Sequence, residues 1–338
     1  MLNSLHQRTL PMPVILLTDP IDPTEARRLE AVAQVRLLGA EGVGPLAEEM
    51  SMADIVIVRR KIPAEDVVGA NRLRALIRHG VGLDFIPVET ASANGIAVTN
   101  TPGTNEQSVA EQVFGMVLGL RRDILRNDTQ VRAGAWDGCR ARALDRRDLH
   151  GATLGLIGFG SIGRAVARIA HFGFGMTVVA TKRSQSDGPE WVRLCPLDDV
   201  LSTADILVLA CPLTPETRSL ISREALAKMQ PDSILVNIAR GPVVDEAALA
   251  DALRDGVIGG ACLDVFTTQP LPPESPLRSA PNTVLSPHVA GVTADSMRRM
   301  SQVAVDDALR ILSAEQPRHL CNAQAWPEIA KRWATYAT

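Results

Sequence analysis

The chain has 338 residues, and its hydrophobic content of 46% is sufficient for the cores of two domains of ordinary size. Its formal net charge of −3 argues against nucleic acid as a partner, because nucleic-acid-binding domains carry a strongly basic face. The five cysteines form no C-x-x-C pair, which argues against a metal site or a disulfide scaffold and favours a reducing compartment. We find no signal-peptide pattern and no apolar run of about 18 residues, so we expect a cytoplasmic protein without a membrane partner.

The N-terminal part of the chain alternates short apolar runs with helical patterns. This alternation is typical of a parallel α/β sheet. A helix is expected at residues 24–32, with Thr24 as a possible N-cap. Strands are expected at residues 14–17, 55–58, 73–77 and 96–99.

The pattern changes after Asn105. Residues 109–120 are apolar and predict a long helix. Residues 121–150 are charged and rich in Arg, and we interpret them as a helical arm with Trp136 as an anchor.

A glycine-rich turn lies between two apolar runs at residues 153–157 and 176–180. Gly158, Gly160 and Gly163 have the spacing G-x-G-x-x-G, and apolar residues follow at helical intervals. In a strand–helix–strand unit, this spacing is typical of a site that binds the pyrophosphate of a dinucleotide at the helix N-terminus. We therefore expect the cofactor to contact the three glycines together with Ser161 and Ile162.

The end of the second strand indicates which dinucleotide binds. NAD-binding units place Asp or Glu about 20 residues past the glycines, where it holds the ribose hydroxyls. This chain has Thr181, Lys182, Arg183 and Ser184 there, without a carboxylate. Two cations and two hydroxyls suit a 2′-phosphate, so the sequence favours NADP and leaves NAD possible. The alternative is that Lys182 and Arg183 are solvated loop charges.

The remainder of the chain continues the α/β pattern. Strands are expected at residues 206–209, 234–237, 257–264 and 283–285, and a long amphipathic helix at residues 293–312. We expect the tail, with Trp326, Trp333 and Tyr336, to pack on the first domain. We find no internal repeat, but both halves are α/β, which suggests one cleft between two similar domains.

Two residues with suitable chemistry follow predicted strands. Ligands of open α/β sheets bind beyond the carboxyl ends of the strands. Arg240 offers a planar fork that can hold a carboxylate and an adjacent carbonyl oxygen. His288 can donate or accept one proton near neutral pH. Together with a nicotinamide, they form a plausible carbonyl-reduction site.

Seven motifs occur in order between residues 14 and 312: RHGVGLD, NTPGTNEQSVAE, GLIGFGSIGRAVA, PLTPETRSLI, ILVNIARGPVVDE, CLDVF and SPHVAG. In combination they resemble the D-isomer-specific 2-hydroxyacid dehydrogenase family. The resemblance implies two Rossmann-like, doubly wound domains with a cleft between them, and a homodimer. It assigns residues 1–104 and 290–338 to a flavodoxin-like substrate-binding domain, and residues 105–289 to the dinucleotide-binding domain.

The resemblance also implies roles for individual residues. Arg240 would bind the substrate carboxylate and polarise the carbonyl, and His288 would donate the proton in reduction. The backbone of Val81 and Gly82, together with Asn105, would contact the substrate. Further cofactor contacts would come from Pro212, Thr217, Ala239 and Asp264, the last on the nicotinamide side.

The chain departs from the family at Gln269. Most members have a Glu there that is hydrogen-bonded to the catalytic His, whereas formate dehydrogenases have Gln. A carboxylate beside His stabilises the imidazolium, while an amide can only orient the ring. Gln269 is therefore expected to complete the catalytic set with a weaker effect on His288.

Arg59 and Arg60 match the place where phosphoglycerate dehydrogenases have an Arg near the substrate phosphate, so one of them is expected to favour substrates with a distal anion. The sequence as a whole predicts an NADP-preferring oxidoreductase that transfers hydride to or from C2 of a small 2-keto or D-2-hydroxy acid. Two alternatives are a reaction like that of formate dehydrogenase, and a nucleotide-sensing protein like the corepressors of the family.

Overall fold

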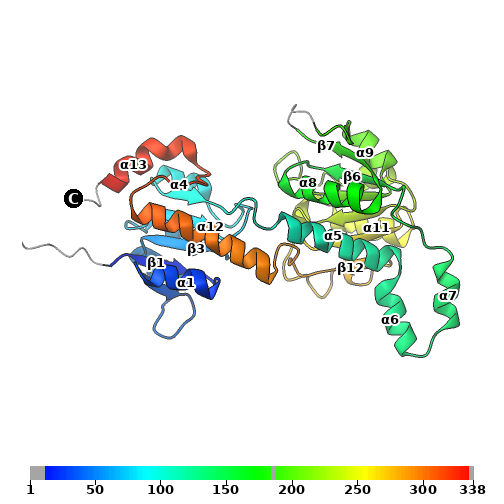
Figure 1. The fold of residues 1–338 in the computed structure, drawn as a ribbon, viewed down its shortest axis with the longest axis horizontal. Helices are drawn as coiled ribbons and strands as arrows, with labels where there is room; N and C mark the ends of the chain where they lie inside the picture. The colour runs from blue at the N-terminus through cyan, green and yellow to red at the C-terminus, as the bar shows by residue number, and fades with distance from the viewer. Residues whose placement is uncertain (1–11, 184–187, 335–338) are drawn as a thin grey trace, which may run out of the picture. The chain divides into compact units, whose positions relative to one another are not determined.

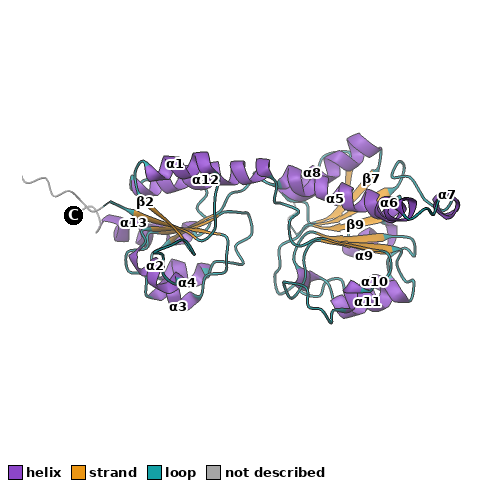
Figure 2. Cartoon of the chain, turned by 90° about the horizontal axis from the view of Figure 1, so that it is seen from below, coloured by secondary structure: helices purple, strands orange, loops and turns teal. Residues whose placement is uncertain are grey.

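The computed structural model describes residues 12–183 and 188–334. The chain divides into two compact units (Figure 1). The first unit comprises residues 1–105 and 294–338, and the second comprises residues 106–293. Each unit contains one parallel β-sheet with helices on both faces (Figure 2). The fold class is therefore the expected one, with two doubly wound α/β units.

The first unit has a five-stranded sheet in the order β2-β1-β3-β4-β5, which is the flavodoxin-like order. Every strand pair is parallel. Central strands β1 and β3 contain only apolar residues, because both faces of a parallel sheet are buried. The strands are β1 Val14–Leu17, β2 Gln34–Leu37, β3 Ile55–Val58, β4 Ala75–Arg78 and β5 Ala97–Thr99.

Helices from both ends of the chain cover this sheet. One core layer contains α1 (Pro23–Glu30), α12 (Ala294–Leu312) and α13 (Trp326–Ala334). Ile329 and Trp333 of α13 are buried in it, as expected for the tail, whereas Tyr336 lies outside the described residues. The other layer contains α2 (Leu46–Met52), α3 (Ala64–Val68) and α4 (Val88–Ala93).

The expected N-cap of the first helix was wrong by two residues. Asp22 caps α1, since its Oδ1 accepts hydrogen bonds from the N–H groups of Thr24 and Glu25 at 2.9 and 3.3 Å. Pro23 then occupies the first turn, where its missing N–H costs nothing. Asp22 is as good an N-cap residue as Thr, so the sequence offered two acceptable caps.

The second unit has a seven-stranded sheet in the order β12-β11-β10-β9-β6-β7-β8. Counted from β6, this is the Rossmann order 3-2-1-4-5-6 with a further strand at the edge. Short edge strand β8 was not expected from the sequence because it carries only one full apolar–polar alternation. The strands are β6 Thr153–Ile157, β7 Thr177–Thr181, β8 Val192–Leu194, β9 Ile206–Leu209, β10 Ile234–Asn237, β11 Gly260–Leu263 and β12 Thr283–Leu285.

Two helical layers cover this second sheet. Helices α5 (Glu106–Arg121) and α8 (Ser161–Arg168), with the π-helical turn Ile169–Gly173, supply one core layer. Helices α9 (Leu197–Thr203), α10 (Arg223–Ala227) and α11 (Glu246–Arg254) supply the other. The buried strands therefore present apolar side chains to both faces.

The charged segment after α5 forms the expected helical arm, with α6 (Ile124–Arg132) and α7 (Asp137–Ala143). Asp123 joins the two helices, because its carboxylate lies 3.2 Å from Arg146 and 3.8 Å from Arg142. Trp136 does not anchor the arm to its own unit as expected, since 61% of this residue is exposed in the single chain. An aromatic residue between two short helices had no layer to pack against within its own unit.

Both units use the same short motif to start their central strands. The segments MADIVIV and TADILVL begin at residues 52 and 203. Asp54 Oδ2 accepts a hydrogen bond from Val14 N at 2.9 Å, and Asp205 Oδ2 accepts one from Thr153 N at 2.8 Å. Each Asp thus fixes the first residue of the neighbouring strand, a short structural repeat that we did not find in the sequence.

Candidate functional site

The residues with expected roles in the second unit follow its strands at one edge of the sheet. All of these strands are parallel, so their carboxyl ends lie at the same edge. The glycine turn follows β6, Lys182 follows β7, Arg240 follows β10, and His288 follows β12. This edge is where open α/β sheets bind their ligands.

The glycine-rich turn has the geometry of a pyrophosphate cradle. Gly158 has a φ of 98°, and a Cβ there would lie 2.7 Å from the backbone of Ala210. A Cβ at Gly163 would lie 2.4 Å from the carbonyl oxygen of Gly158. At Gly160, by contrast, a Cβ would meet nothing within 4 Å, so this side of the turn is open to a ligand. The residues present therefore fit a dinucleotide at the start of α8, beside Ser161 and Ile162.

Lys182 and Arg183 lie directly beyond β7, where the ribose of a bound dinucleotide is expected. Ser184 falls outside the described residues. A hydrogen bond from the Thr214 side chain and one from the backbone lower the pKa of Glu216, and the charge of Arg183 lowers it slightly further.

The loop from Pro212 to Thr217 follows β9, the neighbour of β6. The Thr217 hydroxyl donates to the carbonyl of Pro212 at 2.7 Å and accepts from Thr214 N at the same distance. These bonds give the loop a fixed shape beside the glycine turn. Burial raises the pKa of the Cys211 thiol, which is consistent with a packed small residue in this loop.

Arg240 is held by a short network at the end of β10. Asn237 is buried, its Nδ2 donates to the carbonyl of Arg240 at 3.0 Å, and its Oδ1 accepts from Ala239 N at 3.0 Å. A Cβ at Gly241 would lie 2.0 Å from the backbone of Phe266, so only glycine permits this approach. The role of Asn237 in holding Arg240 was not predicted from the sequence. A polar residue at the end of an apolar strand, three residues before an Arg, could have indicated this role.

His288 and Gln269 contact each other. Gln269 Nε2 donates to the carbonyl of Phe266 at 3.1 Å, which directs Oε1 toward His288 Nδ1 at 2.9 Å. Because Oε1 can only accept, His288 Nδ1 carries the hydrogen. The amide thus orients the ring without adding a charge.

Asp264 braces the loop that carries His288. Asp264 is 1% exposed, and its Oδ1 accepts from Ser286 Oγ at 2.6 Å and from Val289 N at 2.9 Å. Its Oδ2 accepts from Ala290 N at 2.9 Å, and its backbone carbonyl accepts from His288 N at 2.8 Å. The cofactor contact that the resemblance implies for Asp264 stays a prediction. The bonds hold His288 at a φ of 57°, a left-handed conformation that is costly for a non-glycine residue.

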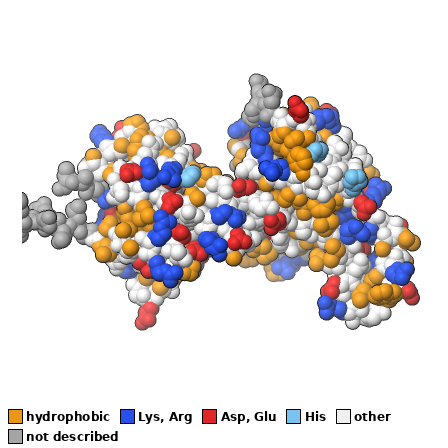
Figure 3. Space-filling model, in the orientation of Figure 1, with side chains coloured by type: hydrophobic (Ala, Val, Ile, Leu, Met, Phe, Trp, Pro, Cys, Tyr) orange, Lys and Arg blue, Asp and Glu red, His pale blue; other side chains and the backbone are white. Residues whose placement is uncertain are grey.

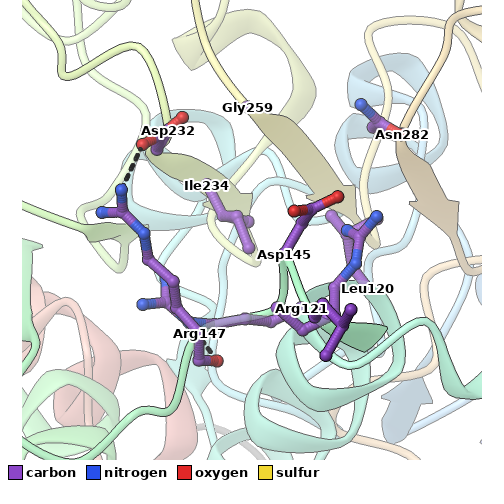
Figure 4. A pocket seen from close by; sticks show the side chains of 10 residues that line it. Leu120, Arg121, Asp145, Arg147, Asp232, Ile234, Gly259 and Asn282 are labelled. Atoms are coloured by element: carbon purple, nitrogen blue, oxygen red, sulfur yellow. Dashed lines mark hydrogen bonds and ion pairs between the residues drawn. The ribbon is translucent and has the colours of Figure 1, made fainter. Parts of the chain in front are cut away.

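The described part of this unit contains at least two cavities. One, of about 630 Å³, is bordered by His288, Gln269 and Phe266 and lies beside the functional edge. The other, of about 530 Å³, is lined by Arg121, Arg147 and Asp232 and borders the amino ends of β10 and β11 (Figure 4). Only the first of these cavities borders candidate site residues, whereas the second lies at the opposite edge of the sheet from the one where open α/β sheets bind ligands.

The expected substrate residues of the first unit also follow strands. Arg59 follows β3 and its N–H donates to Thr18 Oγ1 at 2.8 Å, while Arg60 forms an ion pair with Asp19 at 3.0 Å. Val81 and Gly82 follow β4. Asn105 Oδ1 is buried and has no hydrogen-bond partner among the described residues. Within the described ranges, no cluster of metal-ligating side chains occurs, and no helix is long and apolar enough to cross a membrane.

We expect Asp264→Asn to destabilise the second unit and loosen the His288 loop. Every group on the carboxylate is a donor, so the new NH₂ would face an N–H or O–H group and leave it unsatisfied, at a cost of about 1–3 kcal/mol. Thermal unfolding and hydrogen exchange at residues 286–290 would measure the effect. Asp128→Asn, at an exposed ion pair of the same unit, is the control. Equal unfolding temperatures and equal hydrogen exchange at residues 286–290 in the two variants would contradict the bracing role of Asp264.

Comparison with known proteins gives consistent matches. Residues 114–290 match the family model of the D-isomer specific 2-hydroxyacid dehydrogenase NAD binding domain. Glyoxylate/hydroxypyruvate reductase B of Pectobacterium carotovorum subsp. carotovorum is 40% identical over 267 residues, which cover 78% of this chain and 83% of the relative.

Two solved structures are similar over most of the chain. The NADPH-dependent glyoxylate/hydroxypyruvate reductase of Sinorhizobium meliloti, in complex with NADP and malonate, is 30% identical with a TM-score of 0.80, covering 94% of this chain and 98% of that one. The NAD-dependent formate dehydrogenase of Staphylococcus aureus is 26% identical with a TM-score of 0.79, covering 90% and 96%. By its motifs, its two doubly wound sheets and these matches, the chain belongs to the D-isomer specific 2-hydroxyacid dehydrogenase family.

Proposed function

We propose that the protein is an NADPH-preferring reductase of small 2-keto acids of the glyoxylate and hydroxypyruvate type. The observation that carries the proposal is the His288–Gln269 pair, at the same sheet edge as the open glycine turn and Arg240. Relatives named glyoxylate/hydroxypyruvate reductase support the substrate class.

In the proposed mechanism, the Arg240 guanidinium binds the substrate carboxylate and polarises the adjacent carbonyl. His288 Nε2 donates a proton to the developing hydroxyl oxygen, and Gln269 keeps the ring in the required orientation. The bound dinucleotide supplies the hydride. The N–H groups of Val81 and Gly82 are further proposed ligands of the carboxylate, and Asn105 is a proposed substrate contact.

Arg59 is the better candidate for recognising a distal anion on the substrate. The side chain of Arg60 is 59% exposed and forms an ion pair with Asp19. Arg59 is half-buried and lies where the strand order reverses between β1 and β3, which is where open α/β sheets bind ligands. An unchanged KM for a substrate with a distal anion in Arg59→Ala would count against this role.

Two other functions agree less well with the observations. A reaction like that of formate dehydrogenase needs no proton relay, and among the solved structures the formate dehydrogenase is 26% identical to this chain, against 30% for the glyoxylate/hydroxypyruvate reductase. A nucleotide-sensing role would not require the bonds that orient His288 and Arg240. Turnover of a 2-keto acid distinguishes the reductase from both alternatives.

We also propose a homodimer formed through the helical arm. Figure 3 shows hydrophobic side chains gathered on the arm, at the lower right. Such a cluster is typical of a protein–protein interface. The exposed apolar side chains of this segment are Ile124, Leu125, Val131, Trp136 and Leu144. A monomeric mass in analytical ultracentrifugation would contradict the proposal.

The state of the cysteines supports a cytoplasmic location, which we propose. All five are free thiols in the structure, as favoured by a reducing compartment. Recovery of the protein outside the cytoplasm in cell fractionation would contradict this assignment.

The primary test is reduction of glyoxylate and hydroxypyruvate with NADPH and with NADH. We expect a higher kcat/KM with NADPH, and we expect Lys182→Ala/Arg183→Ala to reduce this preference by about tenfold or more, because charge-assisted bonds to the 2′-phosphate are lost. Arg168→Ala, an exposed Arg in the last turn of α8, is the control. A wild-type preference for NADH would overturn the assignment of NADPH.

Arg240 and His288 should differ kinetically. Arg240→Ala should raise KM for the keto acid and lower kcat, since the guanidinium serves both carboxylate and carbonyl. His288→Ala should mainly lower kcat, by about 10²–10⁴-fold for a lost general acid. Steady-state kinetics with both substrates measure the difference, and near-normal turnover by either variant removes that residue from the proposed site.

Gln269→Glu should change the pH dependence of reduction. A carboxylate in place of Oε1 would favour the imidazolium and raise the pKa of His288 by about one to three units. Reduction requires protonated His288, so the fall in rate should move to higher pH, and oxidation should respond in the opposite sense. Profiles of kcat/KM from pH 5 to 9 test this, and superimposable profiles would show that proton donation by His288 does not limit the rate.

A further inference from the structure

The loop that follows β4 in the first unit has fixed carbonyl groups. The carbonyl of Gly80 accepts from Thr101 N at 3.0 Å, and the carbonyl of Val81 accepts from Asn100 Nδ2 at 2.8 Å. The carbonyl of Gly82 accepts from Arg78 Nε at 3.1 Å. Three successive carbonyls of the loop are therefore held by donors within the same unit.

The N–H groups of the same peptides have no such partners. Among the residues that the structure describes, neither Val81 N–H nor Gly82 N–H has a hydrogen-bond acceptor. In a planar trans peptide, the N–H points away from the C=O of the same unit. The bonds from Thr101 and Asn100 therefore turn Val81 N–H and Gly82 N–H away from the protein interior. Successive N–H groups of this kind form a concave site for an anion.

The Arg78 side chain holds the loop after β4 through hydrogen bonds to backbone carbonyls. Its Nη1 donates to the carbonyls of Val58 and His79 at 2.8 and 3.1 Å, and its guanidinium lies 4.6 Å from the centre of the Phe85 ring. Gly80 has a φ of 149°, and a Cβ there would lie 3.1 Å from the Arg78 guanidinium carbon. The missing side chain of Gly80 makes room for this brace.

We propose that Asn100 and Arg78 are positioning residues that preform an anion site at the N–H groups of Val81 and Gly82. The inference rests on the proposed function for the identity of the anion, which is the carboxylate of the 2-keto acid. Asn100 acts directly on the peptide that carries Gly82 N–H, and Arg78 holds the next carbonyl and the start of the loop. Neither side chain needs to touch the substrate.

The test uses Asn100→Ala in the full chain. Asn94→Ala is the matched control, because Asn94 Nδ2 also donates to a backbone carbonyl of the same unit at 2.8 Å, that of Thr90. Oxalate, in the presence of NADP⁺, serves as a carboxylate probe that requires no turnover. Hydrogen exchange over residues 79–86 reports whether the N–H groups become protected when oxalate binds.

We expect oxalate to protect Val81 and Gly82 in the wild type and in Asn94→Ala. In Asn100→Ala, the Kd of oxalate and the KM of the keto acid should rise about tenfold, with kcat within about threefold and the Kd of NADPH unchanged. Arg78→Lys should raise the Kd of oxalate and the KM of the keto acid by less than Asn100→Ala does. Lys can still donate a hydrogen bond to one carbonyl, although it lacks the planar fork of Arg. If Asn100→Ala does not fold, the rise in Kd and KM is tested with Arg78→Lys and Arg78→Met. Arg72→Met, which removes an ion pair with Asp54 in the same unit, is then the control.

The outcomes separate the inference from the proposed function. Oxalate protection without reduction of any 2-keto acid would refute the function and retain the anion site. Turnover without protection at Val81 and Gly82 would refute the site and retain the function. Equal Kd and KM values for Asn100→Ala and Asn94→Ala would overturn the role of Asn100.

Discussion

The second unit depends on the buried carboxylate of Asp264. A charge without hydrogen bonds in the interior is costly, and Asp264 meets this requirement with donors from Ser286, Val289 and Ala290. The same bonds close the loop after β12 and hold His288 in its left-handed conformation. The backbone of His288 is thereby fixed, and its ring contacts Gln269.

Parallel sheets explain why the remaining functional groups gather at one edge. Each follows the carboxyl end of a strand, so a short loop is enough to place it. At the amino ends, Asp54 and Asp205 fix the first residues of β1 and β6, the strands next to the central strands of the two units.

Neutral amides do much of the positioning in this protein. Gln269 uses its NH₂ to hold Phe266 and its oxygen to orient His288, while Asn237 uses both ends of its amide around Arg240. Asn100 holds the carbonyl of Val81 in the first unit. An amide can donate and accept at fixed angles without adding charge, so it can orient a neighbour while leaving the electrostatics to Arg240 and to the bound ligands.

The sequence by itself determined the strands whose apolar runs are bounded by turn residues, among them β1, β3, β6, β9, β10 and β12. It also determined the glycine turn, because the spacing of Gly158, Gly160 and Gly163 answers local steric demands. Tertiary structure alone decided that Asp264 braces the His288 loop and that Asn100 orients the loop after β4. These tasks join residues 19 to 26 positions apart, across different strands, and no local pattern encodes which donor will face a buried oxygen. The exposed Trp136 shows the same limit, because burial depends on which surfaces meet and not on the residue alone.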